Sequence, residues 1–139
     1  MAGVATYTDV VRIVEHLPEV TEGERHGRRT WFLGKKGFAW ERPLTKADVK
    51  RWGDAPLPEG DLLAVAVADL DDKEAVLQAG IPGVFTITHF DGYPSLLIQL
   101  RHVPKPALRA LVVDAWLAVA PSALADEFLA SPRGRRHTR

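Results

Sequence analysis

The sequence predicts an α+β fold, a two-layer domain with a mostly antiparallel sheet and helices on one face. Two pairs of short alternating segments, within residues 29–42 and 84–100, close around glycine-containing turns and predict β-hairpins. A continuous apolar run at residues 62–68 predicts one further, buried strand. Helical spacing of apolar residues at 9–17 and 105–119 predicts helices that cover the apolar face of this sheet.

The first half of the chain begins with a helix whose apolar residues recur from Val10 to Leu17. A proline follows at once and ends that helix. We expect residues 21–23 to form a polar connection. In the first hairpin, residues 29–33 pair with residues 38–42, and successive side chains point to opposite faces.

Shorter helices complete the order. Thr45 and Asp48 have the spacing of a capping box, which predicts a short helix at residues 45–52. Acidic residues favour a helix start before residues 72–78, and a closing helix is expected at residues 122–129. Apart from the short helix after the first hairpin and the closing one, the expected order is α-β-β-β-α-β-β-α.

Length and composition favour one domain. Residues 1–130 of the 139 are expected to form it, and residues 131–139 to form a basic, disordered tail. The chain has no cysteine, which excludes disulfides and thiol catalysis and fits a reducing cytoplasm. No apolar run approaches the about 18 to 20 residues of a membrane span, and the N-terminus lacks the pattern of a signal peptide. We therefore expect a cytoplasmic protein.

The charges are segregated along the chain although the net charge is zero. Residues 25–51 contain nine lysines or arginines and two acids, a net charge of +7. Residues 133–139 add a net charge of +4. Such blocks create a local positive field that attracts polyanions. The alternative is a solvated face without a ligand.

The central basic block predicts a nucleic-acid-binding surface on the first hairpin. The residues expected to neutralise phosphates are Arg25, Arg28, Arg29, Lys35, Lys36, Lys46, Lys50 and Arg51. Large aromatic side chains lie mostly inside proteins, so Trp31 and Trp40 are interpreted as core residues. Binding by charge alone does not require them.

A second candidate site is the turn that contains His89, Asp91 and Tyr93. These side chains are interpreted first as parts of a turn, and a ligand cleft beside them is the alternative. The five histidines show no metal-binding spacing, and no nucleotide or hydrolase motif is present. We expect no catalytic residue, no metal and no cofactor.

Three segments, in order, resemble one protein family. They are Leu17-Pro-Glu-Val-Thr-Glu22, Thr86-Ile-Thr-His-Phe-Asp-Gly-Tyr-Pro94 and Leu111-Val-Val-Asp-Ala-Trp-Leu-Ala-Val-Ala-Pro121. Together they resemble the MmcQ/YjbR family, from about Val10 to Phe128. The resemblance implies a domain similar to bacterial frataxin and secretion chaperones. Members usually carry a basic residue after the Ala-Pro pair, where this chain has serine and alanine.

The resemblance also implies a function, because members are labelled DNA-binding with paired hairpins acting as a double wing. The expectation is a non-enzymatic protein that binds DNA through the cationic hairpin with little sequence specificity, since no recognition helix is evident. The alternative expectation is a protein-interaction or small-ligand-binding module. The oligomeric state is left open.

Overall fold

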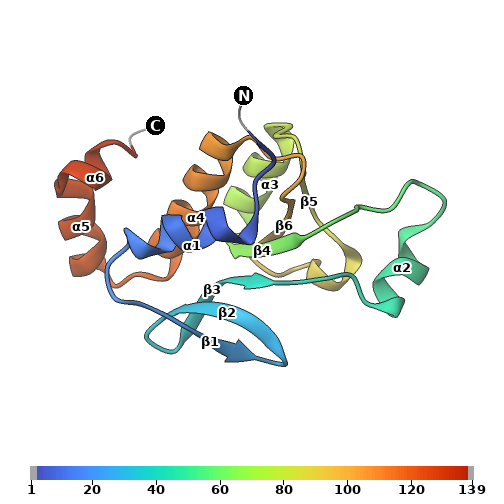
Figure 1. The fold of residues 1–139 in the computed structure, drawn as a ribbon, viewed down its shortest axis with the longest axis horizontal. Helices are drawn as coiled ribbons and strands as arrows, with labels where there is room; N and C mark the ends of the chain where they lie inside the picture. The colour runs from blue at the N-terminus through green and yellow to red at the C-terminus, as the bar shows by residue number, and fades with distance from the viewer. Residues whose placement is uncertain (1–2, 138–139) are drawn as a thin grey trace.

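The computed structural model describes residues 3–137 of the chain. The helices are α1 (Tyr7–Glu15), α2 (Lys46–Trp52), α3 (Leu70–Gln78), α4 (Lys105–Val119), α5 (Ser122–Ala130) and α6 (Pro132–Arg135), with a 3-10 turn η1 (Thr88–Phe90). The strands are β1 (Val20–Arg25), β2 (Arg28–Leu33), β3 (Lys36–Glu41), β4 (Leu62–Ala66), β5 (Val84–Phe85) and β6 (Ser95–Gln99). They form one antiparallel sheet in the order β1-β2-β3-β4-β6-β5 (Figure 1).

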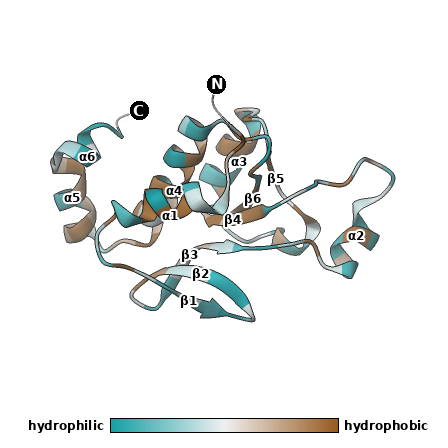
Figure 2. Ribbon diagram, in the orientation of Figure 1, coloured by the Kyte–Doolittle hydropathy of each residue, from teal (hydrophilic) through white to brown (hydrophobic). Residues whose placement is uncertain are grey.

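Helices cover one face of this sheet and bury the main core. Helix α4 packs across β3 and β4, and α1 packs against α4 (Figure 1). Trp31 of β2, Leu63 of β4 and Leu96 of β6 meet Leu108 and Trp116 of α4 in this layer. In Figure 2, β4 is coloured mainly as hydrophobic, whereas β1 and β2 contain hydrophilic segments. The two-layer α+β fold expected from the sequence is confirmed.

The opposite face of the sheet is covered only in part. Cross-strand partners share a face, so Thr30, Trp40, Ala64 and Leu97 form one row across β2, β3, β4 and β6. Helix α2 and turn η1 pack over part of this row and close a second, smaller apolar cluster there, which includes Phe90. The part of this face over β1, β2 and β3 stays open to solvent, and it is called the open face below.

A β-bulge in β3 divides the side chains between the two faces. Trp31 pairs with Ala39, but the next residue of β2, Phe32, pairs with Gly37, so the register shifts by one residue. The extra residue, Phe38, is buried with Ala39 in the helix-covered core. Trp40 therefore points to the open face.

The strand β1 was not expected, and the prediction of a polar connection at residues 21–23 is wrong. All its residues after Val20 are exposed, so no apolar alternation marks the strand in the sequence. The turn to β2 consists of His26 and Gly27, which both have positive φ angles, 52° and 73°. Two such residues give the twist that a two-residue hairpin needs. The first hairpin is thus a three-stranded unit.

Two further expectations differ from the structure. The strand predicted at residues 84–89 ends at Phe85, because residues 88–90 turn into η1. The tail predicted to be disordered at residues 131–139 is ordered through residue 137, where the Ser131 side chain caps α6 by accepting from the Gly134 N–H at 3.1 Å. His137 also contacts Asp114 of α4 at 2.7 Å. Residues 138–139 lie outside the described residues.

None of the helices within residues 3–137 combines the length and the apolar character that crossing a membrane requires.

Candidate anion-binding cleft

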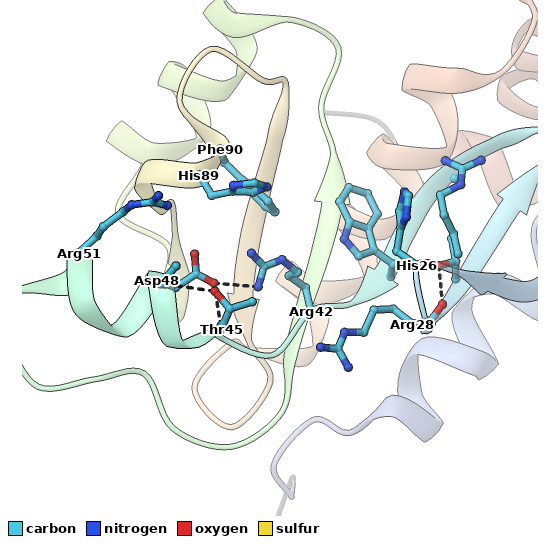
Figure 3. Close-up of a pocket in the computed structure, with 13 residues that line it drawn as sticks. His26, Arg28, Arg42, Thr45, Asp48, Arg51, His89 and Phe90 are labelled. Atoms are coloured by element: carbon cyan, nitrogen blue, oxygen red, sulfur yellow. Dashed lines mark hydrogen bonds and ion pairs between the residues drawn. The ribbon is translucent and has the colours of Figure 1, made fainter.

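A cleft of about 680 Å³ lies on the open face of the sheet. It is bounded by the β1–β2 turn on one side and by α2 and η1 on the other, with β3 between them (Figure 3). Its basic lining residues come from all these elements and are Arg25, His26, Arg28, Arg42, Arg51 and His89. Four arginines, spread over the sequence from residue 25 to residue 51, therefore line one cleft.

The floor of the cleft is aromatic. Trp40 is half-buried on β3, and its ring centroid lies 6.4 Å from that of Phe90 of η1. Thr30 lies beside Trp40 in the same cross-strand row, and its hydroxyl donates to the Arg28 carbonyl oxygen at 2.9 Å. An apolar floor reduces the local solvation, which strengthens the interaction of nearby guanidinium groups with an anion.

The acid in the cleft lining, Asp48, is already paired. Its carboxylate lies 2.9 Å from the Arg42 guanidinium, and the exposed fractions of the two side chains are 2% and 12%. Burial alone would raise the pKa of Asp48, but the hydrogen bond from the Thr45 backbone N–H and the Arg42 guanidinium together lower it. The guanidinium of Arg42 also lies 5.6 Å from the centre of the Phe90 ring.

The remaining arginines of the cleft carry unbalanced charge. Within residues 3–137, Arg25, Arg28 and Arg51 form no ion pair. Arg25 is held in place because its guanidinium donates to the Lys35 carbonyl oxygen at 2.7 Å and lies over the Phe32 ring. Such groups, fixed but not neutralised, are suited to contact the oxygens of a phosphate or carboxylate.

A buried lysine positions the wall of the cleft that contains η1. Lys73 of α3 is 7% exposed and donates to the carbonyl oxygens of Phe90 at 2.6 Å and of Tyr93 at 2.9 Å. Burial lowers the pKa of Lys73, and the nearby Asp91 carboxylate opposes this shift. The loop that presents His89 to the cleft is therefore tied to α3.

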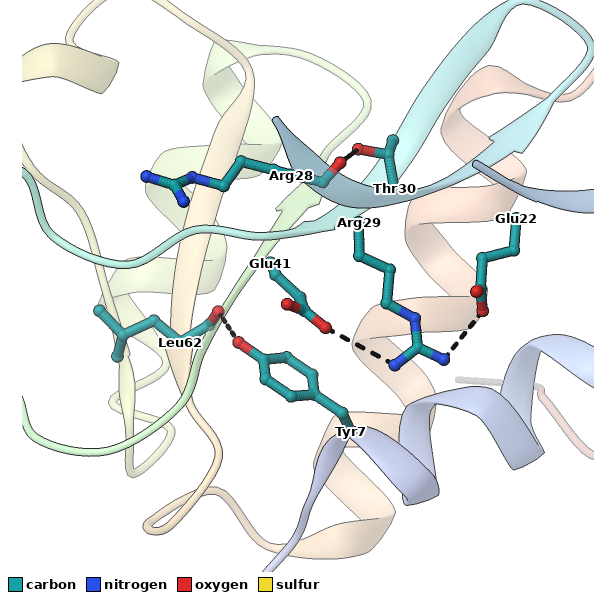
Figure 4. A network of polar contacts seen from close by, with 7 residues as sticks. All are labelled: Tyr7, Glu22, Arg28, Arg29, Thr30, Glu41 and Leu62. Atoms are coloured by element: carbon teal, nitrogen blue, oxygen red, sulfur yellow. Dashed lines mark hydrogen bonds and ion pairs between the residues drawn. The ribbon is translucent and has the colours of Figure 1, made fainter. Parts of the chain in front are cut away.

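Arg29 lies on the other face from Arg28, although the two residues are neighbours in sequence. Its guanidinium lies 2.9 Å from Glu22 and 3.6 Å from Glu41 (Figure 4). The guanidinium also lies 5.0 Å from the centre of the Trp31 ring. The hydrogen bond to Glu22 is the main reason why the pKa of Arg29 is raised. Arg29 is thus part of an ion-pair network beside α1 and does not line the cleft.

The other residues of the predicted surface lie outside the cleft lining. Lys35 and Lys36 lie at the β2–β3 turn, and Lys46 and Lys50 lie on α2, all exposed. Of the second predicted site, His89 lines the cleft. Asp91 and Tyr93 do not line it, and Tyr93 is 62% exposed. The structure therefore joins Arg25, Arg28 and Arg51 of one predicted site with His89 of the other.

The cleft residues that sequence reasoning did not select as site residues include His26, Trp40, Arg42 and Phe90. The dipeptide His26-Gly27 between two arginines was the available signal, since a glycine-containing pair is typical of a tight hairpin turn. Trp31 was expected in the core and is 1% exposed, which confirms that interpretation. Trp40 packs against the smaller apolar cluster and also lines the cleft.

Among the residues that the structure describes, no three histidine, aspartate or glutamate side chains are grouped as the ligands of a metal ion would be.

Comparison with known proteins shows relatives and a shared fold. No family model matches the chain. It is 44% identical over 131 residues to uncharacterized protein Rv2570 of Mycobacterium tuberculosis and to uncharacterized protein Mb2600 of Mycobacterium bovis, and each alignment covers 91% of this chain and 98% of the relative. The chain therefore belongs to the same family as these mycobacterial proteins.

A solved structure shares the fold. The crystal structure of Deinococcus radiodurans protein DR2400, which has a DUF419 domain, matches with a TM-score of 0.58 over 94% of this chain and 91% of that chain. The sequence identity is 17%, so the match concerns the fold alone.

Proposed function

We propose that the protein binds DNA, with phosphates in the cationic cleft and with little sequence specificity. The observation that carries this proposal is the convergence of Arg25, Arg28 and Arg51 around a cleft whose lining acid, Asp48, is neutralised by Arg42. Phosphate contacts hold a nucleic acid without reading its sequence.

The surroundings of the cleft support a longer nucleic-acid path. Exposed lysines flank it at the β2–β3 turn, Lys35 and Lys36, and on α2, Lys46 and Lys50. Each phosphate neutralised releases condensed counterions, so the affinity would fall steeply with salt. The proposal includes a non-enzymatic, cytoplasmic role, as expected from the sequence.

We further infer that the family shared with the mycobacterial proteins is the MmcQ/YjbR family. The three ordered motifs support this inference, and the fold shared with a DUF419-domain protein is compatible with it. Membership would agree with the DNA-binding label that such proteins carry.

A second candidate function is the binding of a small phosphorylated ligand. The cleft volume of about 680 Å³ favours it, because pockets for small molecules usually measure about 300 to 1,000 Å³. The aromatic floor formed by Trp40 and Phe90 could contact a flat ring while the arginines bind its phosphate.

The test is a fluorescence-anisotropy titration with a labelled random DNA duplex, from low to physiological salt. We expect binding by the wild type, and the double variant Arg28→Gln/Arg51→Gln should bind more weakly with a salt slope smaller by roughly 2. Arg135→Gln is the matched control, since Arg135 is an exposed arginine outside the cleft.

The outcomes separate the two candidate functions. Unchanged affinity in the double variant would contradict the DNA proposal for this cleft. Adenosine monophosphate is titrated in parallel by calorimetry. Binding of this nucleotide at one per chain, lost in the same double variant while DNA does not bind at low salt, would favour the small ligand.

A further inference from the structure

A second basic pocket lies far from the cleft, among the helices. It measures about 320 Å³ and is lined by residues in and directly after α1, α4, α5 and α6. Helices α5 and α6 lie at the opposite end of the molecule from α2 (Figure 1). Four arginines line it: Arg12 of α1, Arg109 of α4, Arg133 of α6, and Arg136 directly after α6. None of them was selected as a site residue from the sequence.

The charges of these arginines are not balanced by neighbours. Among residues 3–137, no acidic residue lines the pocket and none of the four arginines forms an ion pair. Asp9, three residues before Arg12 on α1, is paired with Lys105 at 3.6 Å. Four arginines therefore line one space, and their mutual repulsion would be relieved by a bound anion.

The pocket is built rather than formed by a loose tail. His137 contacts Asp114 of α4 at 2.7 Å, and this contact ties the segment after α6 to the helical layer. Gly134 is buried against the backbone of Phe128, where a larger residue would collide with the Phe128 carbonyl group. These contacts hold in place the segment that carries Arg133 and Arg136.

The lining also limits the kind of anion. Apolar side chains that include Phe128 form part of the wall, which reduces solvation near the guanidinium groups. An adjoining pocket shares Arg133 and Arg136 but is also lined by Glu19 and Glu127. These carboxylates would repel a polyanion that continued past the arginines, so the charge favours a short anion over a long nucleic-acid backbone.

We propose that this pocket binds a small, multiply charged phosphate group, such as a pyrophosphate or the terminal phosphates of a phosphorylated small molecule. Guanidinium groups match phosphate oxygens with paired hydrogen bonds, and four of them suit an anion with several charges. The site is separate from the DNA-binding cleft, and this inference does not depend on the function proposed there.

The experiment is isothermal titration of the full chain with inorganic pyrophosphate at low ionic strength. The test variant is Arg12→Gln/Arg133→Gln, because both side chains are exposed and their loss leaves the core intact. We expect the affinity for pyrophosphate to fall at least about tenfold. Arg135→Gln, which removes an exposed arginine of the same helix outside the pocket, should bind like the wild type.

Two further measurements assign the site. Amide resonances of α6 and of the pocket side of α1 should shift on addition of pyrophosphate, and the cleft variant Arg28→Gln/Arg51→Gln should retain this response. Unchanged pyrophosphate affinity in Arg12→Gln/Arg133→Gln would overturn the inference. It would also be overturned if that variant lost affinity for the DNA duplex but not for pyrophosphate, because the arginines would then belong to the DNA surface.

Discussion

The two faces of the sheet use the same residue types in opposite ways. On the helix-covered face, Arg29 lies between Glu22 and Glu41, and Trp31 beneath it is 1% exposed. On the open face, Arg28 has no ion pair within the described part of the chain, and the half-buried Trp40 forms the floor of a cleft.

This difference shows that the net charge of a segment does not predict how many of its charged side chains are available to a ligand, because some of them are paired within the protein. The basic block from residue 25 to residue 51 is divided by the pleat of β2, which places Arg28 and Arg29 on opposite faces of the sheet. Arg29 joins β1, β2 and β3 through its ion pairs with Glu22 and Glu41. Arg28 is left for an anion, and paired substitutions on the two faces test this division.

The largest difference in the free energy of unfolding is expected between substitutions of the two tryptophans, Trp31 and Trp40. Trp31→Ala should lower the free energy of unfolding by about 4 kcal/mol, because it leaves a large cavity in the core. Trp40→Ala should lower it by only about 2 kcal/mol, since this side chain is half-buried, but it should also weaken ligand binding in the cleft. Urea unfolding of both variants measures the difference, and equal losses would contradict the assignment of the two faces.

The next largest effect concerns the ion pair at the edge of the cleft. Asp48→Asn should destabilise the protein by about 3 kcal/mol at pH 7, because it leaves the largely buried Arg42 without a partner. Asp54→Asn, which removes an exposed acid, is the control and should change stability by less than about 0.5 kcal/mol.

The pH dependence of this effect has a defined sign. The folded-state pKa of Asp48 is lowered, so its contribution is present above the unfolded-state pKa of about 3.9 and is lost as the pH falls through the folded-state pKa. The difference in unfolding free energy between wild type and Asp48→Asn should therefore shrink below about pH 4. A difference that stays constant down to pH 2 would show that the charge is not responsible.

A smaller effect is expected at Tyr7, beside the network of the helix-covered face. Its hydroxyl donates to the Leu62 carbonyl oxygen at 2.6 Å (Figure 4), so Tyr7→Phe should remove about 1 kcal/mol of stability at pH 7. Burial raises the pKa of Tyr7, and Glu41 and Asp61 raise it further.

The contribution of Tyr7 to stability depends on pH in the opposite direction from that of Asp48. A raised folded-state pKa means that the contribution is present below about pH 10 and is lost as the pH rises through the folded-state value. The stability of wild type and Tyr7→Phe should therefore converge in alkaline solution. Tyr93→Phe is the control, because Tyr93 is 62% exposed, and it should match the wild type at every pH.

The sequence allowed the layers of the fold to be predicted, but it did not show how the charges divide between them. The apolar run of β4 and the helical spacing of α4 are strong signals, and the alternation of β2 placed Trp31 and Thr30 on opposite faces, as observed. The strand β1 has no such signal because its residues after Val20 are exposed.

The missing strand explains why the cleft was only partly predicted. Glu22 of β1 lies opposite Trp31 of β2. Because of this strand pairing, the Glu22 carboxylate reaches the Arg29 guanidinium, although the two residues are seven apart in sequence. The presence of Arg51 and His89 in the same cleft as Arg28 depends on how α2 and η1 pack over the sheet. Neither arrangement follows from local periodicity, so neighbouring arginines look equivalent in the sequence.

The smallest effects on stability are expected for Arg28 and Arg29, and they should differ between the two residues. Arg29→Ala should lower the free energy of unfolding by about 0.5 to 1 kcal/mol through loss of the ion pairs with Glu22 and Glu41, which are partly exposed. Arg28→Ala should change it by less than about 0.5 kcal/mol, because its side chain is exposed and has no ion pair within residues 3–137.

The effects on DNA binding should be reversed. Arg28→Ala should reduce the salt slope of binding by about 0.9, the contribution of one phosphate contact, whereas Arg29→Ala should leave the slope unchanged. Each variant is the control for the other, since both remove one arginine from the same strand. Equal reductions of the slope would mean that the ligand responds to the total charge of the hairpin. Unequal ones would show that the pleat of β2 selects which arginine the ligand meets.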